Sequence, residues 1–221
     1  MKNDTAVSPP KAAAITAVLF DKDGTLIDFN ATWRTAYEAV VLEVTGGDQD
    51  LAQRLLEAGG WDAAGQRFLA GSLCAAASTH EIAEAWATLL PGAQDASALA
   101  AHMDKRFTRA GALKVQAVTP LPDLFSMLKA RGLLLGGYDS GNGRKPGPGM
   151  VLAFCRALGL EPASVAVVGD NGHDMEMGRR AGAGLLVGVL SGTSLAYDLE
   201  PAADYLLPDI SHLPDLLNRL G

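Results

Sequence analysis

Cysteine is scarce in this sequence, which contains only Cys74 and Cys155. The two lie far apart, without CxxC spacing and without the third and fourth partners that a zinc site needs. Neither a framework of disulfide bonds nor a structural zinc site is therefore supported. We expect two buried free thiols.

Long apolar runs are missing as well. The longest stretches, such as residues 12–20, are interrupted by Thr16 and fall far short of the roughly 20 residues that a membrane-spanning helix needs. The chain opens with Lys2, Asn3 and Asp4, and no apolar core of a signal peptide precedes a small-residue cleavage site. We therefore expect a cytoplasmic chain with no membrane partner.

An excess of basic residues is also absent. Lys and Arg number 18 against 25 Asp and Glu, which gives a formal net charge of −7 and a pI near 5.0. Because no cluster of Lys and Arg offsets this balance, the composition argues against a nucleic-acid partner. It also means that a phosphate-bearing substrate would need a locally positive site.

What the sequence does have is apolar content, 48% of all residues, in segments of recognisable type. Residues 15–20 and 165–168 are short apolar runs that end at polar turns, as expected for central strands of a parallel sheet. A third run covers residues 185–189, and helical patterns at 150–158 and 175–181 alternate with these runs. This alternation predicts an α/β fold with a doubly wound, mostly parallel sheet.

The segment from about Thr32 to Gly111 has a different pattern. It is rich in Ala and Leu, has helical periodicity and contains no convincing strand, so we expect a helical insertion. Its three tryptophans, Trp33, Trp61 and Trp86, are more typical of packing in a small helical domain than of a ligand cage.

Two aspartates directly follow the first predicted strand. Asp21 and Asp23 lie in the segment DKDGT, in which Gly24 permits close approach of the backbone and Thr25 offers a hydroxyl and an amide to an anion. The alternative is an Asx-type turn in which both aspartates only cap the following segment. The sequence farther along the chain favours a functional site.

A second pair of acids follows the second predicted strand. Asp170 and Asp174 lie in the segment GDNGHD, and we expect them at the same edge of the sheet as the first pair. Two unit charges 4 Å apart repel by about 4 kcal/mol at an effective dielectric constant of 20, so such a cluster requires a cation. Carboxylate ligands without His or Cys spacing favour Mg²⁺. We expect His173 beside the metal rather than bound to it.

A lysine lies between these motifs in a stiff segment, GNGRKPGP. The ammonium of Lys145 could hold a carboxylate in place and stabilise negative charge on a transferring phosphoryl group. The alternative is a solvated loop lysine. The neighbouring glycines match neither a Walker loop nor a GxGxxG turn, because Arg144 precedes the lysine and Pro146 follows it.

Taken in order, DKDGT, the Lys-Pro pair and GDNxxD resemble motifs one, three and four of the haloacid dehalogenase superfamily. With a helical insertion after motif one, the chain looks like the phosphoglycolate phosphatase-like branch, whose helical cap closes over small phosphate monoesters. The resemblance spans roughly Ile15 to the C-terminus. It implies a catalytic core of residues 1–28 and 112–221 and a cap of residues 29–111.

The resemblance also implies a role for each motif residue. Asp21 would be the nucleophile and a magnesium ligand, while Asp23 would protonate the leaving oxygen, later activate water and offer its backbone carbonyl to the metal. Lys145 would clamp phosphate and nucleophile, Asp170 would bind magnesium directly, and Asp174 would support the metal shell. The residues implied in substrate binding are Gly24, Thr25, Ser140 and Asn171.

One departure concerns motif two. The family places a second strand ending in Thr or Ser, then a helix and a third strand, before the lysine, whereas residues 133–136 run straight into what resembles the loop after the third strand. Roughly one βα unit, on the order of 25 residues, is absent. Losing the motif-two hydroxyl would cost about 3 to 4 kcal/mol of transition-state stabilisation. Ser140 is the nearby substitute, unless it is a loop hydroxyl that does not reach phosphate.

These observations predict a magnesium-dependent phosphatase that hydrolyses small phosphate monoesters such as phosphoglycolate through an aspartyl-phosphate. Two alternatives stay open: a catalytically impaired relative that keeps phosphate or metal binding, and a phosphotransferase or phosphomutase on the same scaffold. The expected partner is a small phosphorylated metabolite, bound by a monomer or a homodimer.

Overall fold

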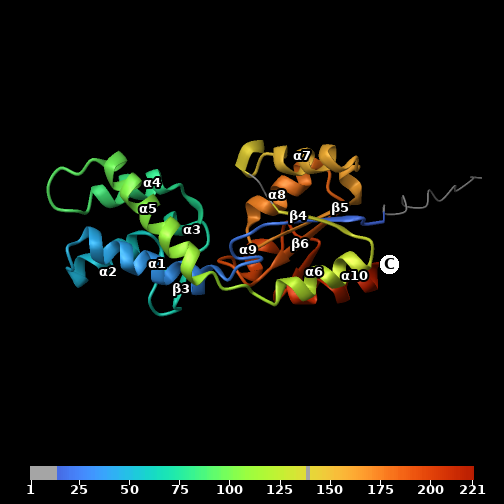
Figure 1. The fold of residues 1–221 in the computed structure, drawn as a ribbon, viewed down its shortest axis with the longest axis horizontal. Helices are drawn as coiled ribbons and strands as arrows, with labels where there is room; N and C mark the ends of the chain where they lie inside the picture. The colour runs from blue at the N-terminus through green and yellow to red at the C-terminus, as the bar shows by residue number, and fades with distance from the viewer. Residues whose placement is uncertain (1–13, 138–139) are drawn as a thin grey trace, which may run out of the picture.

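The chain leaves its first strand for a lobe of helices and then returns to complete a sheet (Figure 1). The computed structural model describes residues 14–137 and 140–221. We call the part built from α1 to α5 the helical lobe, and the sheet with its covering helices the sheet lobe. The two lobes lie beside each other along the long axis of the molecule.

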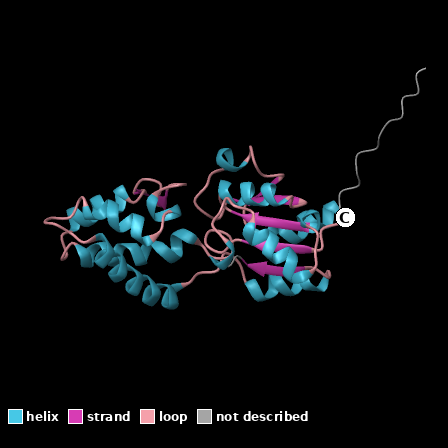
Figure 2. Cartoon of the chain, turned by 90° about the horizontal axis from the view of Figure 1, so that it is seen from above, coloured by secondary structure: helices cyan, strands magenta, loops and turns pink. Residues whose placement is uncertain are grey.

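Five parallel strands form the sheet, in the order β4-β1-β5-β6-β7. Their carboxyl ends face the helical lobe (Figure 2). Strands β1, β5 and β6 are buried along their whole length, which explains why they read as continuous apolar runs rather than as alternating patterns. The strands are β1 (Ala17–Phe20), β4 (Leu134–Gly137), β5 (Val165–Gly169), β6 (Leu185–Val189) and β7 (Tyr205–Leu207).

Helices cover both faces of this sheet (Figure 1). Alternate side chains of β1 point to opposite faces, so that Val18 and Phe20 pack in one apolar cluster while Ala17 and Leu19 pack in another. Helices α6 (Leu121–Ala130) and α10 (Leu213–Leu220) cover the first face, and α7 (Gly149–Leu158) and α8 (Gly172–Ala181) cover the second. The remaining short helices are α9 (Ala196–Leu199), η1 (Ser140–Asn142), η2 (Pro162–Ser164) and η3 (Ile210–His212).

The helical lobe has its own apolar core, in which Phe68, Trp86 and Met103 are fully buried. Aspartate and serine side chains accept hydrogen bonds from the first turns of α1, α2, α4 and α5, which fixes where these helices begin. The helices are α1 (Phe29–Val44), α2 (Gln49–Ala58), α3 (Leu73–Ala76), α4 (Thr79–Ala87) and α5 (Ala96–Lys114).

Most of the predicted architecture is confirmed. The fold is α/β with a parallel sheet covered on both faces, and both cysteines are buried and free. The expectation of no strand in the insertion was wrong, because β2 (Trp61–Asp62) and β3 (Arg67–Phe68) form a small antiparallel pair that is too short for periodicity to reveal. The domain boundaries at residues 28 and 111 stay predictions.

The shortened connection before Lys145 is visible in the sheet. Within the described residues, β4 is the single strand between the helical lobe and that lysine, and it forms the edge of the sheet beside β1. The chain then passes through η1 to α7.

No helix in the described part of the chain combines the length and apolar character needed to span a membrane.

We predict that two neighbouring positions on α6 differ strongly in their effect on stability. Leu128 is 0% exposed and packs in the sheet-lobe core, whereas Met127 is 55% exposed. Leu128→Ala should lower the free energy of unfolding by about 2 to 5 kcal/mol, and Met127→Ala by less than about 1 kcal/mol. Urea unfolding followed by far-UV circular dichroism measures both. Equal losses in the two variants would contradict the packing described here.

Candidate active site

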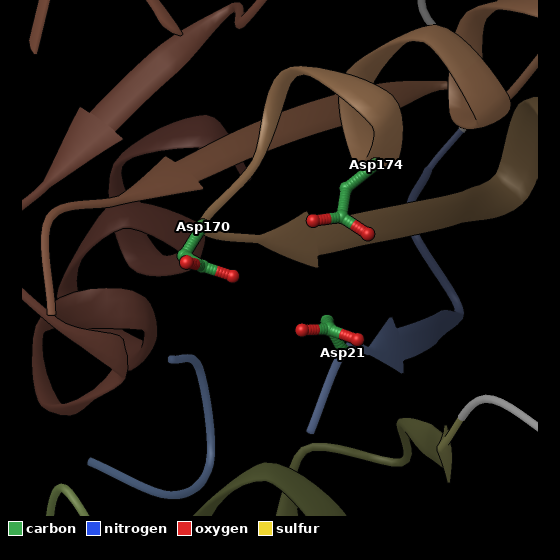
Figure 3. A group of neighbouring side chains, drawn as sticks. All are labelled: Asp21, Asp170 and Asp174. Atoms are coloured by element: carbon green, nitrogen blue, oxygen red, sulfur yellow. The ribbon is translucent and has the colours of Figure 1, made fainter. Parts of the chain in front are cut away.

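The ends of β1 and β5 bring two predicted site residues to one place. The strands are paired in register, Phe20 beside Val168, and the backbone N–H of Asp21 donates to the carbonyl of Val168 at 2.8 Å. Asp170 follows β5 by one residue, and Asp174 lies in the first turn of α8. The three carboxylates therefore point toward one another at the carboxyl edge of the sheet (Figure 3).

Lys145 joins two of these acids. Its Nζ lies 2.6 Å from Oδ1 of Asp21 and 2.6 Å from Oδ1 of Asp174. Carboxylate oxygens of the three aspartates, including Asp170, all lie within 4.8 Å of one another. One ammonium thus faces three acids, and full ionisation would leave this group with a net charge of −2.

Burial and mutual repulsion make two of the acids weak. Burial raises the pKa of Asp170 to about 7, with Asp21 adding to the rise, and burial raises the pKa of Asp174 to about 8. Burial lowers the pKa of Lys145, but the carboxylates of Asp174 and Asp21 together raise it by more than burial lowers it. The pKa of Lys145 therefore lies above its usual value. One ammonium does not balance the charge of three acids.

Asp174 is held by the start of its own helix. Its Oδ2 accepts a hydrogen bond from the backbone N–H of Asn171 at 3.0 Å, while the Asn171 side chain accepts from the N–H of His173 at 3.0 Å. This reciprocal capping fixes the fully buried carboxylate toward Lys145. Asn171 thus has a structural role that is visible in its contacts, and its predicted contact with substrate stays a prediction.

Asp170 is held by a loop that our sequence reasoning missed. The backbone N–H of Thr193 donates to Oδ2 of Asp170 at 3.0 Å, and the hydroxyl of Ser191 donates to the carbonyl of Gly24 at 2.8 Å. A Cβ atom at Gly192 would lie 1.8 Å from Oδ2 of Asp170. The signal was available, because this polar, glycine-containing segment directly follows the buried strand β6.

The glycine of the first motif serves the same carboxylate. Gly24 has φ +85°, and a Cβ atom there would lie 2.5 Å from the Asp170 carboxylate. Thr25 is fully buried, and its hydroxyl has no hydrogen-bond partner among the described residues. The side chain of Ser140 lies outside the described part of the structure. Substrate-binding roles for these three residues stay predictions.

Asp23 is placed differently from the other acids. Its Oδ1 accepts a hydrogen bond from Nε1 of Trp33 at 2.9 Å, and its Oδ2 lies 2.9 Å from Nζ of Lys22. Its carboxylate is not part of the cluster formed by Asp21, Asp170 and Asp174. The predicted contact of its backbone carbonyl with a metal stays a prediction.

Two cavities meet at Asp23. The polar cavity, of about 630 Å³, is lined by Asp21, Lys145, Asp170 and the start of α8. The aromatic cavity, of about 500 Å³, is lined mainly by side chains of the helical lobe, among them those of Phe29, Trp33, Tyr37 and Phe107. Lys22, Asp23, Phe29 and Ala75 line both, and Asp23 is the one acid among them. The site therefore has a charged compartment and an apolar compartment with one carboxyl group between them.

The charged compartment fits a hard divalent cation. Its donors are three carboxylates on converging elements, without His or Cys in the group, and the ammonium of Lys145 offsets one of their charges. Oxygen-only ligand sets of this kind favour Mg²⁺. Asp21, Asp170 and Asp174 are the residues that would hold it.

We predict that the metal-free protein becomes less stable as the pH rises from about 4 to about 8. Asp170 and Asp174 keep protons in the folded state up to pKa values of about 7 and about 8, whereas in the unfolded chain they titrate near their ordinary value of about 4. The folded state therefore binds more protons in this range, and the free energy of unfolding falls as they are lost. Thermal unfolding in EDTA between pH 5 and pH 8.5 measures the slope.

Asp170→Asn should flatten this slope and raise the stability of the metal-free protein at pH 8, by on the order of 4 kcal/mol. It should also reduce the stabilisation given by Mg²⁺, because one ligand is lost. Asp215→Asn on the exposed side of α10 is the matched control. It should change neither the slope with pH nor the stabilisation given by Mg²⁺. A destabilised Asp170→Asn protein at pH 8 in EDTA would contradict the charge balance described above.

Known proteins are similar to this chain in sequence. A family model described as haloacid dehalogenase-like hydrolase matches residues 15–182. The N-acetylmuramic acid 6-phosphate phosphatase of Pseudomonas putida is 27% identical over 184 residues, which cover 75% of this chain and 79% of that protein. The D-glycero-β-D-manno-heptose-1,7-bisphosphate 7-phosphatase of Pasteurella multocida is 36% identical over 77 residues. That match covers 35% of this chain and less than half, 42%, of the relative.

Solved structures share the fold. A β-phosphoglucomutase-like protein from Thermotoga maritima has a TM-score of 0.67 at 17% identity, covering 93% of this chain and 99% of that one. A haloacid dehalogenase hydrolase of family IA, variant 3, from Entamoeba histolytica has a TM-score of 0.63 at 17% identity, covering 92% and 100%. The family model confirms the resemblance seen in the sequence: because it matches most of the chain's length, the chain belongs to the haloacid dehalogenase-like hydrolases.

Proposed function

We propose that this chain is a magnesium-dependent phosphatase that hydrolyses small phosphate monoesters through an aspartyl-phosphate on Asp21. The observation that carries the proposal is the contact of Lys145 with Asp21 at 2.6 Å, inside a cavity that also contains Asp170 and Asp174. A nucleophile, a fixed positive charge and ligands for a cation are thus present at one place.

Lys145 restricts the rotation of the Asp21 carboxylate and offers positive charge to the phosphoryl oxygens of a bound ester. A bound Mg²⁺, held by the three aspartates, would neutralise further charge on the phosphoryl group and lower the repulsion between ester and carboxylates. The backbone N–H of Thr193 and the capping of α8 hold Asp170 and Asp174 in position for that role.

Asp23 is the proposed general acid and base, because it lies where the polar and aromatic cavities meet. In the first step an oxygen of Asp21 bonds to phosphorus while the bond from phosphorus to the ester oxygen breaks. Protonated Asp23 gives its proton to that oxygen, which leaves as an alcohol. In the second step Asp23 takes a proton from the water that attacks phosphorus, and Asp21 is released together with inorganic phosphate.

The two cavities suggest how the parts of a substrate would be placed in the site. The phosphate group would occupy the polar cavity, and the remainder of a small metabolite would occupy the aromatic cavity of about 500 Å³. Phosphoglycolate is the substrate that the motif resemblance implies, while the names of the relatives given above suggest sugar phosphates as further candidates. A test panel should therefore contain phosphoglycolate, hexose 6-phosphates, N-acetylmuramic acid 6-phosphate and p-nitrophenyl phosphate.

We predict phosphate release from at least one ester of this panel with Mg²⁺ and loss of that release with EDTA. Asp21→Asn should reduce kcat/KM by about 10³-fold or more, because the amide cannot form the phosphorylated intermediate. Asp215→Asn should retain wild-type activity. Release of inorganic phosphate, followed colorimetrically, is the measurement.

Other outcomes have defined meanings. Unchanged activity of Asp21→Asn would refute the mechanism. Thermal stabilisation by inorganic phosphate without turnover of any ester would instead favour an impaired relative, which the short connection between β4 and Lys145 makes a reasonable rival. Transfer of the phosphoryl group to a sugar rather than to water would identify a phosphotransferase or phosphomutase.

A further inference from the structure

One tryptophan of the helical lobe donates a hydrogen bond to the proposed general acid. Nε1 of Trp33 donates to Oδ1 of Asp23 at 2.9 Å, across ten positions of the sequence. Trp33 lies in the second turn of α1, and both residues line the aromatic cavity. This contact therefore links the helical lobe to the carboxyl group at the junction of the two cavities.

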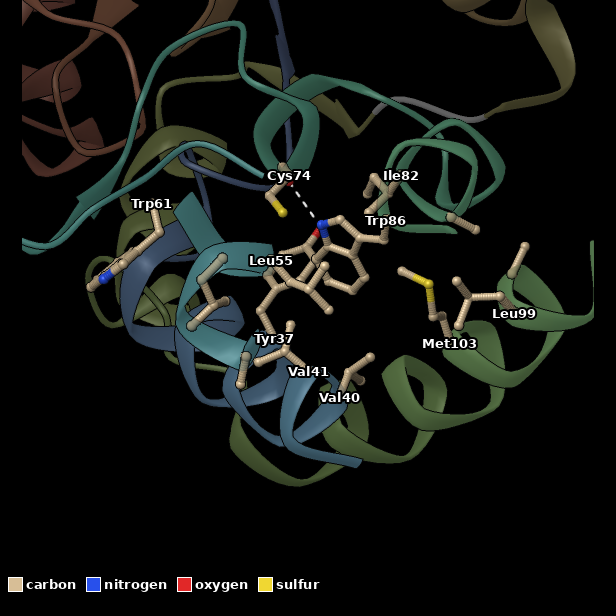
Figure 4. Packing of buried hydrophobic residues seen from close by; sticks show 14 of the residues in the cluster. Tyr37, Val40, Val41, Leu55, Trp61, Cys74, Ile82, Trp86, Leu99 and Met103 are labelled. Carbon is tan, nitrogen blue, oxygen red and sulfur yellow. Dashed lines mark hydrogen bonds between the residues drawn. The ribbon is translucent and has the colours of Figure 1, made fainter. Parts of the chain in front are cut away.

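The indole is held in place from behind. Its ring meets the ring of Phe107 edge-on, with centroids 6.0 Å apart and planes at 85°, and Phe107 in turn packs on Tyr37 at 4.9 Å. Tyr37 lies in the core of the helical lobe, where its hydroxyl donates to the carbonyl of Cys74, the dashed line in Figure 4. The N–H of Trp33 is thus aimed by packing that extends into the core of the helical lobe.

Within the described residues, the other two tryptophans make no such contact. Trp86 is fully buried, and its N–H has no hydrogen-bond partner among the described residues. Trp61 packs on Phe68, and the guanidinium of Arg34 lies 4.9 Å from its ring centroid. Packing accounts for these two residues, as expected from the sequence. It does not account for an indole N–H directed at a motif carboxyl.

The chemistry of the indole makes the contact selective for one oxygen. An indole N–H can only donate, and in a protonated acid the carbonyl oxygen is a better acceptor than the hydroxyl oxygen, so the N–H pairs preferentially with the carbonyl oxygen. Trp33 therefore assigns the carbonyl role to Oδ1 of Asp23 and leaves the proton on Oδ2. Lys22 contacts Oδ2, but its side chain is 60% exposed, and exposed ion pairs hold a side chain only weakly.

We propose that Trp33 is a positioning residue for Asp23, which orients the acid so that Oδ2 delivers its proton to the leaving oxygen of the ester. The inference rests on the proposed phosphatase function. Trp33 transfers no proton itself: the proton passes from Oδ2 of Asp23 to the ester oxygen as the bond from that oxygen to phosphorus breaks. Its effect should therefore depend on how much the leaving group needs a proton.

Trp33→Phe tests this, because phenylalanine keeps an aromatic ring in the packing and lacks the N–H. With an alkyl phosphate, whose alkoxide is a poor leaving group, kcat/KM should fall roughly 10- to 100-fold, a part of the 10²- to 10⁴-fold that a general acid contributes. With p-nitrophenyl phosphate, whose leaving group departs without a proton, it should fall less than about 3-fold. The ratio of the two values of kcat/KM is the measurement.

Trp61→Phe is the matched control: it makes the same chemical change in the same lobe and should leave that ratio unchanged. In an Asp23→Asn background, Trp33→Phe should have less than about 3-fold further effect on the alkyl phosphate, since there is no proton left to direct. Equal losses on both esters, or an undiminished effect beside Asp23→Asn, would overturn the proposal. Thermal unfolding confirms that each variant is folded.

The proposed function and this inference fail in different ways. If Asp21→Asn keeps activity on both esters, the phosphatase mechanism is wrong whatever Trp33 does. If Asp21→Asn is inactive and Trp33→Phe does not change the ratio between the esters, the mechanism stands and Trp33 is only a packing residue.

Discussion

The contact of Lys145 with Asp21 and Asp174 is the interaction on which the site depends. It joins the end of β1, the loop before α7 and the first turn of α8 through one ammonium group. Without it, three acids within 4.8 Å of one another would meet no positive side chain in this group. The glycines and backbone N–H groups around Asp170 serve the same arrangement, because they let a third carboxylate approach closely.

This arrangement is not optimised for stability. Two nearly or fully buried acids have raised pKa values because protein has replaced water around them, and one ammonium is not enough to compensate. With all three acids ionised, this group carries a net charge of −2, which a bound divalent cation would balance. Strain of this electrostatic kind is expected at functional sites, where groups are arranged for a reaction rather than for the resting fold.

The sequence predicted Lys145 from its Pro- and Gly-rich loop, and it predicted that Asp21 and Asp170 meet because parallel strands bring the residues after them to one edge. That rule needs only the position of a strand and of the polar residue that follows it, as for Asp21 and Asp170. The sequence also indicated that Gly24 permits close approach of another group, but it did not indicate that this group is the Asp170 carboxylate. The β2-β3 pair was not predicted, because strands of two residues are too short to show a periodic pattern of apolar residues.

Contacts between separate elements could not be predicted in this way. The bond from Ser191 to Gly24 spans 167 positions, and nothing in either local segment indicates the other. The bond from Trp33 to Asp23 is closer in sequence, yet it depends on the angle at which α1 leaves the site and on the ring of Phe107 behind it. Tertiary geometry of this kind is set by packing, which a pattern of residue types does not encode.

The placement of the tryptophans has an optical consequence. All three lie in the helical lobe, and the sheet lobe, with its reactive carboxylates, contains none. The ultraviolet-excited emission of the native protein therefore originates almost entirely on one side of the site. Because one of these indoles lies against Asp23 at the junction of the two cavities, the molecule carries an intrinsic fluorescent probe at that junction, and no dye is needed to observe events there.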